Sequence, residues 1–184
     1  MPNPALLVMD VQNAVVERFA AESEALLDTL AQAITAARRA GIPVIYVTVA
    51  FRPGAPEISP RNRAFAAAGR SGLFGEDRAT WIHPAVAPEP NDIVVTKKRV
   101  SAFTGSDLDV VLRSLDIDAL VLAGIATSGV VLSTLRQAAD LDFQLTVLRD
   151  GCADGDEEVH RVLLDKVFPR QATVVTAAAW AAGL

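Results

Sequence analysis

Short apolar runs alternate along the chain with longer runs in which apolar and polar residues are mixed. The short runs are rich in valine, isoleucine and leucine, and most of them are too short for a buried helix. They predict strands over residues 5–10, 42–51, 92–97, 119–124, 144–150 and 172–176. The inner runs are apolar at successive positions, as expected for strands of a parallel sheet that is covered on both faces.

Between these runs, apolar residues recur every three or four positions, which is the period of an amphipathic helix. The spacing predicts helices over 23–39, 107–115, 129–141 and 156–167, and a short alanine-rich helix over the last residues. Ser23 and Ser106 stand where N-capping residues are favoured, and Gly41 follows the first helix as a stop. Strand–helix alternation with right-handed crossovers predicts an α/β protein with a three-layer α/β/α Rossmann-like fold and a six-stranded parallel sheet.

Composition narrows the class of protein. The 184 residues suit a single domain over 1–184 with a substantial core, since 51% are hydrophobic and 21% charged. The net charge is -5, and no basic run exceeds Lys97-Lys98-Arg99, which argues against nucleic acid or an anionic membrane as a partner. No apolar stretch reaches the roughly 20 residues that span a bilayer. We therefore expect a soluble protein with a small-molecule substrate.

The cysteine content and the first residues favour a cytoplasmic location. Cys152 is the only cysteine, so no intrachain disulfide can form. The N-terminal run has no basic segment before it and meets Asp10 directly after it, which is typical of a first strand and not of a signal peptide.

Three predicted strand ends carry residues capable of chemistry. Asp10 ends the first strand, Lys97 ends the third, and a small-residue turn at 124–130 follows the fourth. In doubly wound folds, ligands bind at the carboxyl ends of the strands. An acid, a base and a helix start that converge on one crevice predict a hydrolytic or proton-transfer site.

Three segments around these residues resemble the signatures of one family. They are LLVMDVQN at 6–13, VVTKKRVSAFTGSDLDVVL at 94–112 and LVLAGIATSGVVLSTLRQAADLDF at 120–143. In this order they resemble the isochorismatase-like hydrolases, the cysteine hydrolase superfamily, and the resemblance runs from about Ala5 to Thr176. It implies that Asp10 and Lys97 are the catalytic pair, that Lys98 is a bystander, and that no cofactor is needed.

The resemblance also implies a nucleophile position. In the amidases of this family a cysteine follows the glycine of the third block by six residues, which here is Val130. A backbone cradle for an oxyanion, next to a cis peptide, maps to Ile125, Ala126 and Val130. The isochorismatases proper also lack the cysteine and cleave a vinyl ether with the aspartate as proton donor. We therefore expect a hydrolase that works without a thiol, in which a buried Asp10 is the acid.

Two alternatives stay open at this point. One is a binding protein that keeps the fold without catalysis, and the other is an amidase with a displaced nucleophile, Ser128 or Cys152. The family's metal-binding members carry an Asp-x-His pair and a further histidine, and the loop after the second strand has no such ligands, so no metal is expected. His83 lies in a loop and His160 in the middle of a predicted helix.

Further expectations concern the crevice and the assembly. Eight residues are candidates for substrate binding: Gln12, Phe19, Arg52, Trp81, Arg99, Phe103, Thr127 and Ser128. The long connection at 52–80 contains the apolar segments AFAAAG and GLF, which is more apolar surface than a monomer usually exposes. Since relatives commonly form dimers or tetramers, we expect a homo-oligomer.

Overall fold

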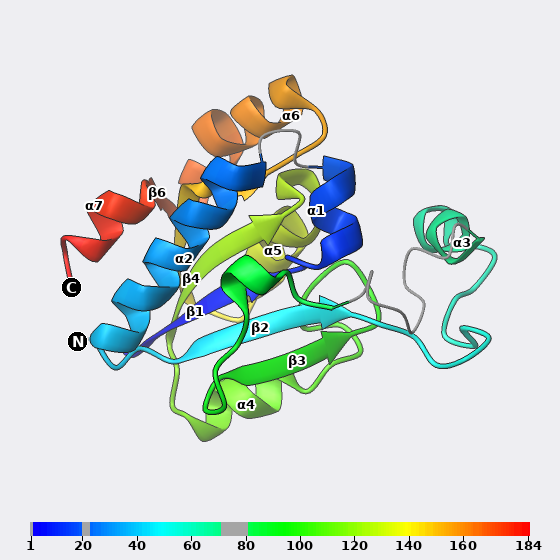
Figure 1. Cartoon of the computed structure of the whole chain (residues 1–184), viewed down its shortest axis with the longest axis horizontal. Helices are drawn as coiled ribbons and strands as arrows, with labels where there is room; N and C mark the ends of the chain where they lie inside the picture. The colour runs from blue at the N-terminus through cyan, green and yellow to red at the C-terminus, as the bar shows by residue number, and fades with distance from the viewer. Residues whose placement is uncertain (1, 20–22, 71–80) are drawn as a thin grey trace.

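A six-stranded parallel sheet forms the centre of the protein (Figure 1). The computed structural model describes residues 2–19, 23–70 and 81–184. The strands are β1 (Pro4–Met9), β2 (Val44–Val49), β3 (Ile93–Lys97), β4 (Ala119–Ile125), β5 (Gln144–Ala153) and β6 (Thr173–Val175), in the order β3-β2-β1-β4-β5-β6. All neighbouring strands pair in parallel. The predicted fold class is confirmed.

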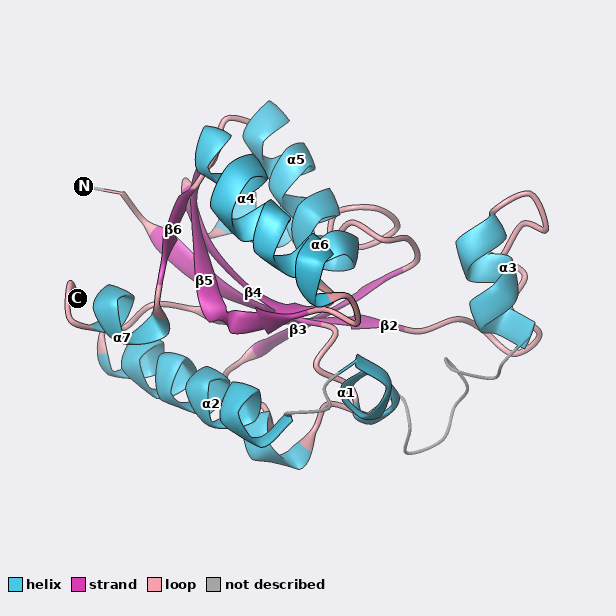
Figure 2. Ribbon diagram, turned by 90° about the horizontal axis from the view of Figure 1, so that it is seen from above, coloured by secondary structure: helices cyan, strands magenta, loops and turns pink. Residues whose placement is uncertain are grey.

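Helices cover both faces of the sheet (Figure 2). One layer contains α1 (Asn13–Phe19), α2 (Ser23–Arg39) and α7 (Ala177–Ala181), and the other contains α4 (Leu108–Ser114), α5 (Leu132–Asp140) and α6 (Glu157–Val162). Successive residues of β1 serve the two layers in turn: Leu7 and Met9 pack toward α4 and α5, whereas Leu6 and Val8 pack toward α1 and α2. Because both faces are buried, the strand is apolar at every position.

The helix α3 (Arg63–Arg70) lies inside the segment expected to be one long connection. It stands apart from the two helix layers, beyond the carboxyl ends of β2 and β3 (Figures 1 and 2). Among the side chains of α3 that the structure describes, those of Phe65 and Ala66 are buried. The long connection expected over 52–80 therefore contains a helix that the sequence did not predict. Residues 71–80, with the GLF segment, lie outside the described residues.

Three predicted elements differ in detail. β5 continues past a register irregularity opposite Leu122 and Gly124 and ends at Ala153, so Cys152 lies inside this strand and not after it. The helix expected from 129 is preceded by a wide turn, η3 (Thr127–Val131), in which Gly129 has the non-helical angles φ −97° and ψ −105°. The helix expected over 156–167 is α6 followed by a wider turn, η4 (Leu163–Val167).

Two short 3-10 turns, η2 (Pro84–Val86) and η5 (Phe168–Arg170), complete the described structure. None of the described helices combines the length and the apolar character that a membrane crossing requires.

Candidate active site

Asp10 stands at the carboxyl end of β1, in the middle of the sheet. Its backbone is left-handed, with φ 55°, a conformation that aspartate tolerates better than most residues. Its N–H donates to the Val47 carbonyl at 2.8 Å. Two positions further on, the Gln12 amide bonds both the N–H and the carbonyl of Val49, at 2.8 and 3.2 Å. These bonds fasten the end of β1 to β2, so the direction of the Asp10 side chain is set by the backbone.

Lys97 reaches Asp10 from β3, across the end of β2. Its Nζ lies 2.9 Å from Asp10 Oδ2 and donates a second hydrogen bond to the Arg99 carbonyl at 2.9 Å. Only 2% of the Lys97 surface is exposed. The ends of the first and third strands are thus joined by an ion pair.

The two oxygens of Asp10 are in different situations. Oδ2 receives the Lys97 ammonium, whereas Oδ1 is buried and has no hydrogen-bond partner within the described part of the chain. Burial raises the pKa of Asp10, and the charge and hydrogen bond of Lys97 act in the opposite direction but are the smaller effects. A carboxyl group with a raised pKa and one unpartnered oxygen is suited to giving and taking a proton.

The segment after Lys97 is held by α5. Ser101 donates from its hydroxyl to Gln137 Oε1 at 2.7 Å, and the Ala102 N–H donates to Thr134 Oγ1 at 3.0 Å. Gly105 has φ 77°, and a Cβ there would lie 2.7 Å from Lys98 Cβ. This tight loop fixes where β3 ends and thereby where the Lys97 side chain begins.

The turn after β4 forms another wall of the site. The peptide bond between Ile125 and Ala126 is cis, at the place the resemblance implies. Ile125, Ala126, Gly129 and Val130 all line the cavity that contains Asp10 and Lys97. Three strand ends and the β4–α5 turn therefore meet at one point.

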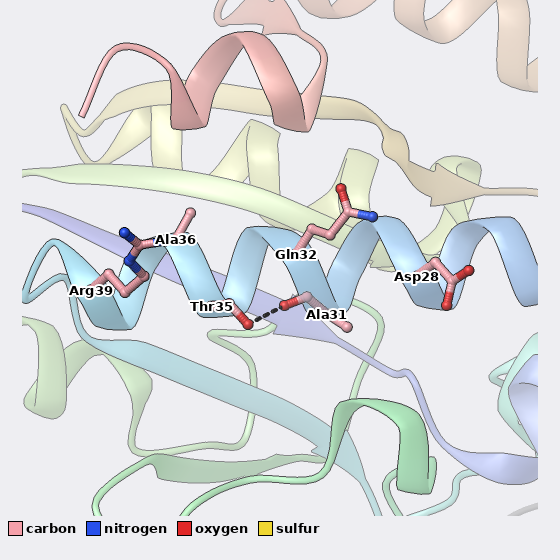
Figure 3. A pocket seen from close by; sticks show the side chains of 6 residues that line it. All are labelled: Asp28, Ala31, Gln32, Thr35, Ala36 and Arg39. Atoms are coloured by element: carbon pink, nitrogen blue, oxygen red, sulfur yellow. Dashed lines mark hydrogen bonds between the residues drawn. The ribbon is translucent and has the colours of Figure 1, made fainter.

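The cavity has a volume of about 230 Å³ and is mainly apolar. In addition to the residues already named, Val15 and Arg18 come from α1, Val49 from β2, Phe65 and Ala68 from α3, and Val100 from the loop after β3. Two larger hollows lie elsewhere. One, about 550 Å³, is an open hollow on the outer face of α2 (Figure 3), where the Thr35 hydroxyl is bonded to the Ala31 carbonyl of its own helix. The other, about 1070 Å³, lies at the opposite, amino ends of β1, β4 and β5.

Several of the predicted binding residues are used elsewhere. The Gln12 side chain is hydrogen-bonded to the backbone of Val49 at the end of β2, as described above. Phe103 packs in the core against Phe143, with ring centroids 6.1 Å apart. Arg52 is exposed and pairs with Glu57 at 2.6 Å. These three side chains were expected to line the crevice. They contact other parts of the protein because their partners lie on segments that only the fold brings next to them.

The other candidates lie closer to the site or at its edge. The Arg99 guanidinium donates to the carbonyls of Lys98 and Glu57 and lies 5.9 Å from the centre of the Phe65 ring. Trp81 is 59% exposed, and the Phe19 side chain lies outside the described residues. Thr127 is fully buried, and the Ser128 N–H is bonded to Asp154.

Sequence reasoning missed the cavity residues on α1 and α3. Val15 and Arg18 follow Asp10 on a helix of only seven residues, which is too short to show a clear period. Phe65 belongs to the AFAAAG segment, for which the sequence predicts exposed apolar surface. The sequence offered one indication that Arg18 belongs to the cavity, which is that it follows Asp10 by only a few residues.

Cys152 is a poor nucleophile in this structure. It is 5% exposed, and burial raises the pKa of its thiol to about 12. Its side chain packs in the core cluster that contains Leu122 and Val147. The thiolate is the reactive form, and buried structural thiols are inert.

We predict that Cys152 resists alkylation in the folded protein. Raising a thiol pKa from 9.0 to about 12 lowers the thiolate fraction on the order of 10³-fold. Iodoacetamide at pH 8, followed by mass spectrometry, should label the native chain far more slowly than the chain unfolded in guanidinium. Rapid native labelling accompanied by loss of activity would instead support Cys152 as the displaced nucleophile.

Over residues 2–19, 23–70 and 81–184, no group of three or more His, Cys, Asp or Glu side chains is arranged to hold a metal ion. His83 uses Nδ1 to accept from the Ala85 N–H at the start of η2.

A doubly wound parallel sheet with a buried acid–lysine pair at its carboxyl edge defines an α/β protein with a candidate small-molecule site. Comparison with known proteins then gives the family. The isochorismatase domain model matches residues 4–179, and the chain belongs to the isochorismatase family.

Relatives and solved structures agree with this assignment. The chain is 33% identical over 166 residues to the uncharacterized isochorismatase family protein YwoC of Bacillus subtilis strain 168, covering 90% of this chain and 86% of that one. It is 34% identical over 168 residues to the ureidoacrylate amidohydrolase RutB of Stutzerimonas stutzeri strain A1501, covering 79% and 68%.

Among solved structures, an isochorismatase family protein from Burkholderia thailandensis superposes with a TM-score of 0.86 at 30% identity, covering 100% of this chain and 96% of that one. The N-carbamoylsarcosine amidase from Thermoplasma acidophilum superposes with a TM-score of 0.78 at 27% identity, covering 96% and 97%.

Proposed function

We propose that this protein hydrolyses a small molecule without a cysteine nucleophile, with Asp10 as general acid and base and Lys97 as its charged partner. The observation that carries the proposal is the asymmetry of the Asp10 carboxyl group. One oxygen is held by Lys97, the other is buried and has no partner among the described residues, and Asp10 lines the cavity. A structural ion pair has no need of an unpartnered oxygen, whereas a proton donor does.

In this mechanism the protonated Asp10 gives its proton to the leaving atom of the substrate as the bond to carbon breaks. A water molecule forms the new bond to that carbon, and its proton returns to the Asp10 carboxylate. Lys97 stabilises the carboxylate between the two steps, since an ammonium at 2.9 Å favours the charged form. The net reaction of the two steps is hydrolysis: one water molecule is added across the broken bond, and Asp10 returns to its protonated form.

We propose that position 130 is the nucleophile position of the thiol-dependent relatives. The Val130 side chain has no atom that can attack carbon, so water takes that part. The backbone N–H groups of Ala126 and Val130 are proposed to hold the developing negative charge on a substrate oxygen. Both residues line the cavity, and neither N–H depends on the side chain at 130.

A displaced nucleophile is less well supported. Cys152 is buried with a raised thiol pKa, as described above. A serine nucleophile needs a base hydrogen-bonded to its hydroxyl. Ser128 is exposed, and within the described residues its hydroxyl has no such partner. Two of the similar proteins are a ureidoacrylate amidohydrolase and an N-carbamoylsarcosine amidase, which makes amide and ureido compounds the first substrates to test.

The test is a screen of small ureido, amide, ester and vinyl ether substrates on the wild type and on Lys97→Met. We expect Lys97→Met to lower kcat/KM by about 10²-fold or more, the scale on which loss of a stabilising group in an active site acts. Lys98→Met is the matched control: the same change one residue further on, where the ammonium bonds the Ala50 carbonyl.

Cys152→Ala should keep the activity. An activity lost in Cys152→Ala but kept in Lys97→Met would overturn the proposal. A wild type that binds compounds of the screen in calorimetry and hydrolyses none of them would favour a non-catalytic binding protein. The homo-oligomeric state and the cytoplasmic location stay predictions.

A further inference from the structure

The buried Thr127 hydroxyl joins the β4–α5 turn to the segment after β5. It lies 3.1 Å from the Ala153 carbonyl and 2.8 Å from His160 Nδ1. A carbonyl can only accept, so the Thr127 hydroxyl donates its single proton to Ala153. The contact with His160 must then run the other way, with Nδ1–H donating to the Thr127 oxygen. This count of donors fixes the proton of His160 on Nδ1.

The charge state of His160 follows from its surroundings. Burial lowers its pKa, and Arg149 acts in the same direction, whereas the carboxylates of Asp154, Asp165 and Glu157 oppose them. At neutral pH the ring is therefore neutral with its proton on Nδ1. Because Nδ1 carries a proton in both charge states, the bond to Thr127 persists when Nε2 is protonated. The hydrogen bond between His160 and Thr127 is therefore a structural contact that does not change with pH.

A second bond lies beside the first. The Ser128 N–H donates to Asp154 Oδ2 at 2.7 Å, and the other oxygen of Asp154 accepts from the Asp156 N–H at 3.3 Å. Two consecutive residues of the turn are thus attached to the end of β5, the following loop and α6, and neither of them lines the cavity.

Within the turn, the Ala126 carbonyl accepts from the N–H groups of Gly129 and Val131, at 3.0 and 3.3 Å. Gly129 departs from helical geometry, and a Cβ built on it would meet nothing nearer than Ala126 Cβ at 3.8 Å. Glycine has the widest choice of backbone conformation, so packing at Gly129 does not define the path of the chain. Thr127 and Ser128 are flanked in the chain by residues that line the cavity, namely Ala126 before them and Gly129 and Val130 after them.

We propose that Thr127 and His160 are positioning residues of the site, which aim the backbone N–H groups of Ala126 and Val130 into the cavity. The inference rests on the proposed function of that cavity, and it assigns a part in the reaction to two side chains that do not touch substrate. The occupant that these N–H groups would hold is an oxygen or sulfur atom with negative charge.

A thiolate introduced at the turn measures this directly and needs no substrate. In the background Val130→Cys with Cys152→Ala, the rate of iodoacetamide alkylation against pH gives the pKa of the thiol at position 130. Backbone N–H groups aimed at the sulfur lower that pKa. We expect Thr127→Val and His160→Leu to slow alkylation at pH 7 by about three- to tenfold, since one pKa unit changes the thiolate fraction tenfold.

Two conservative variants serve as controls. Thr127→Ser keeps the hydroxyl, and His160→Asn keeps an N–H donor near the place of Nδ1, so both should restore the parent pH profile. Thr127→Val is nearly isosteric and decides the matter if His160→Leu does not fold. An unchanged pH profile in folded Thr127→Val, whatever its melting temperature, would show that the pair is only structural. Failure to find any hydrolysis leaves this readout intact, so the two proposals fail separately.

Discussion

Asp10→Asn should reduce turnover by about 10²–10⁴-fold, the usual contribution of a general acid or base. The amide has nearly the size of the carboxyl group but cannot give up and recover a proton. The measurement is kcat and KM on the best substrate of the screen. Most of the loss should fall on kcat, because the cavity keeps its shape. Asp28→Asn is the matched control, since it makes the same chemical change on the exposed face of α2 (Figure 3).

The same variant reports the pKa of Asp10 through stability. Because burial raises this pKa in the folded state, the carboxyl group favours folding most below the pKa of an unfolded aspartate. That contribution is lost as pH rises through the folded value. The free energy of unfolding of Asp10→Asn, relative to wild type, should therefore increase over this window in urea titrations. A difference that is flat with pH, or that moves the other way, would contradict a raised pKa.

Gly124→Ala should destabilise the protein by about 4 kcal/mol or more, which is exceptional for a single substitution. Gly124 has φ 144°, and a Cβ there would lie 2.1 Å from the Met9 carbonyl oxygen and 2.9 Å from the Met9 carbonyl carbon. These are backbone atoms, so no rotamer change relieves the contact, and the paired ends of β1 and β4 must separate. Denaturant unfolding monitored by circular dichroism measures the loss.

Gly41→Ala separates the two causes of that cost. Gly41 also has a positive φ, 72°, but a Cβ there meets nothing within 4 Å. Gly41→Ala should therefore lower the free energy of unfolding only by the cost of a left-handed backbone at alanine, about 1–2 kcal/mol. If Gly124→Ala cost no more than Gly41→Ala, the close approach of β1 and β4 would not exist in solution. Where Gly124→Ala still folds, its activity should also fall, because Met9 and Gly124 directly precede Asp10 and the cis peptide.

The sequence by itself determined the sheet and the chemical pair. The six strands are visible because each is short, apolar and, in the inner positions, buried on both faces. Asp10 and Lys97 interrupt apolar strands at their carboxyl ends, where doubly wound folds place ligands. Polar residues at such positions stand out against their surroundings, so one chain without further information was enough to bring them together.

Tertiary structure alone decided the walls of the cavity and the use of the neighbouring polar groups. α1 and α3 are short helices, which are not stable by themselves and form through packing, so their sequences carry little periodic signal. Gln12 and Phe103 were expected in the crevice. Instead, Gln12 bonds the backbone of Val49 and Phe103 packs against Phe143, and both partners lie far away in the sequence. The bond between Thr127 and His160 likewise joins two elements separated by a whole strand. Such contacts depend on which surfaces the fold brings face to face, and local sequence patterns do not contain that information.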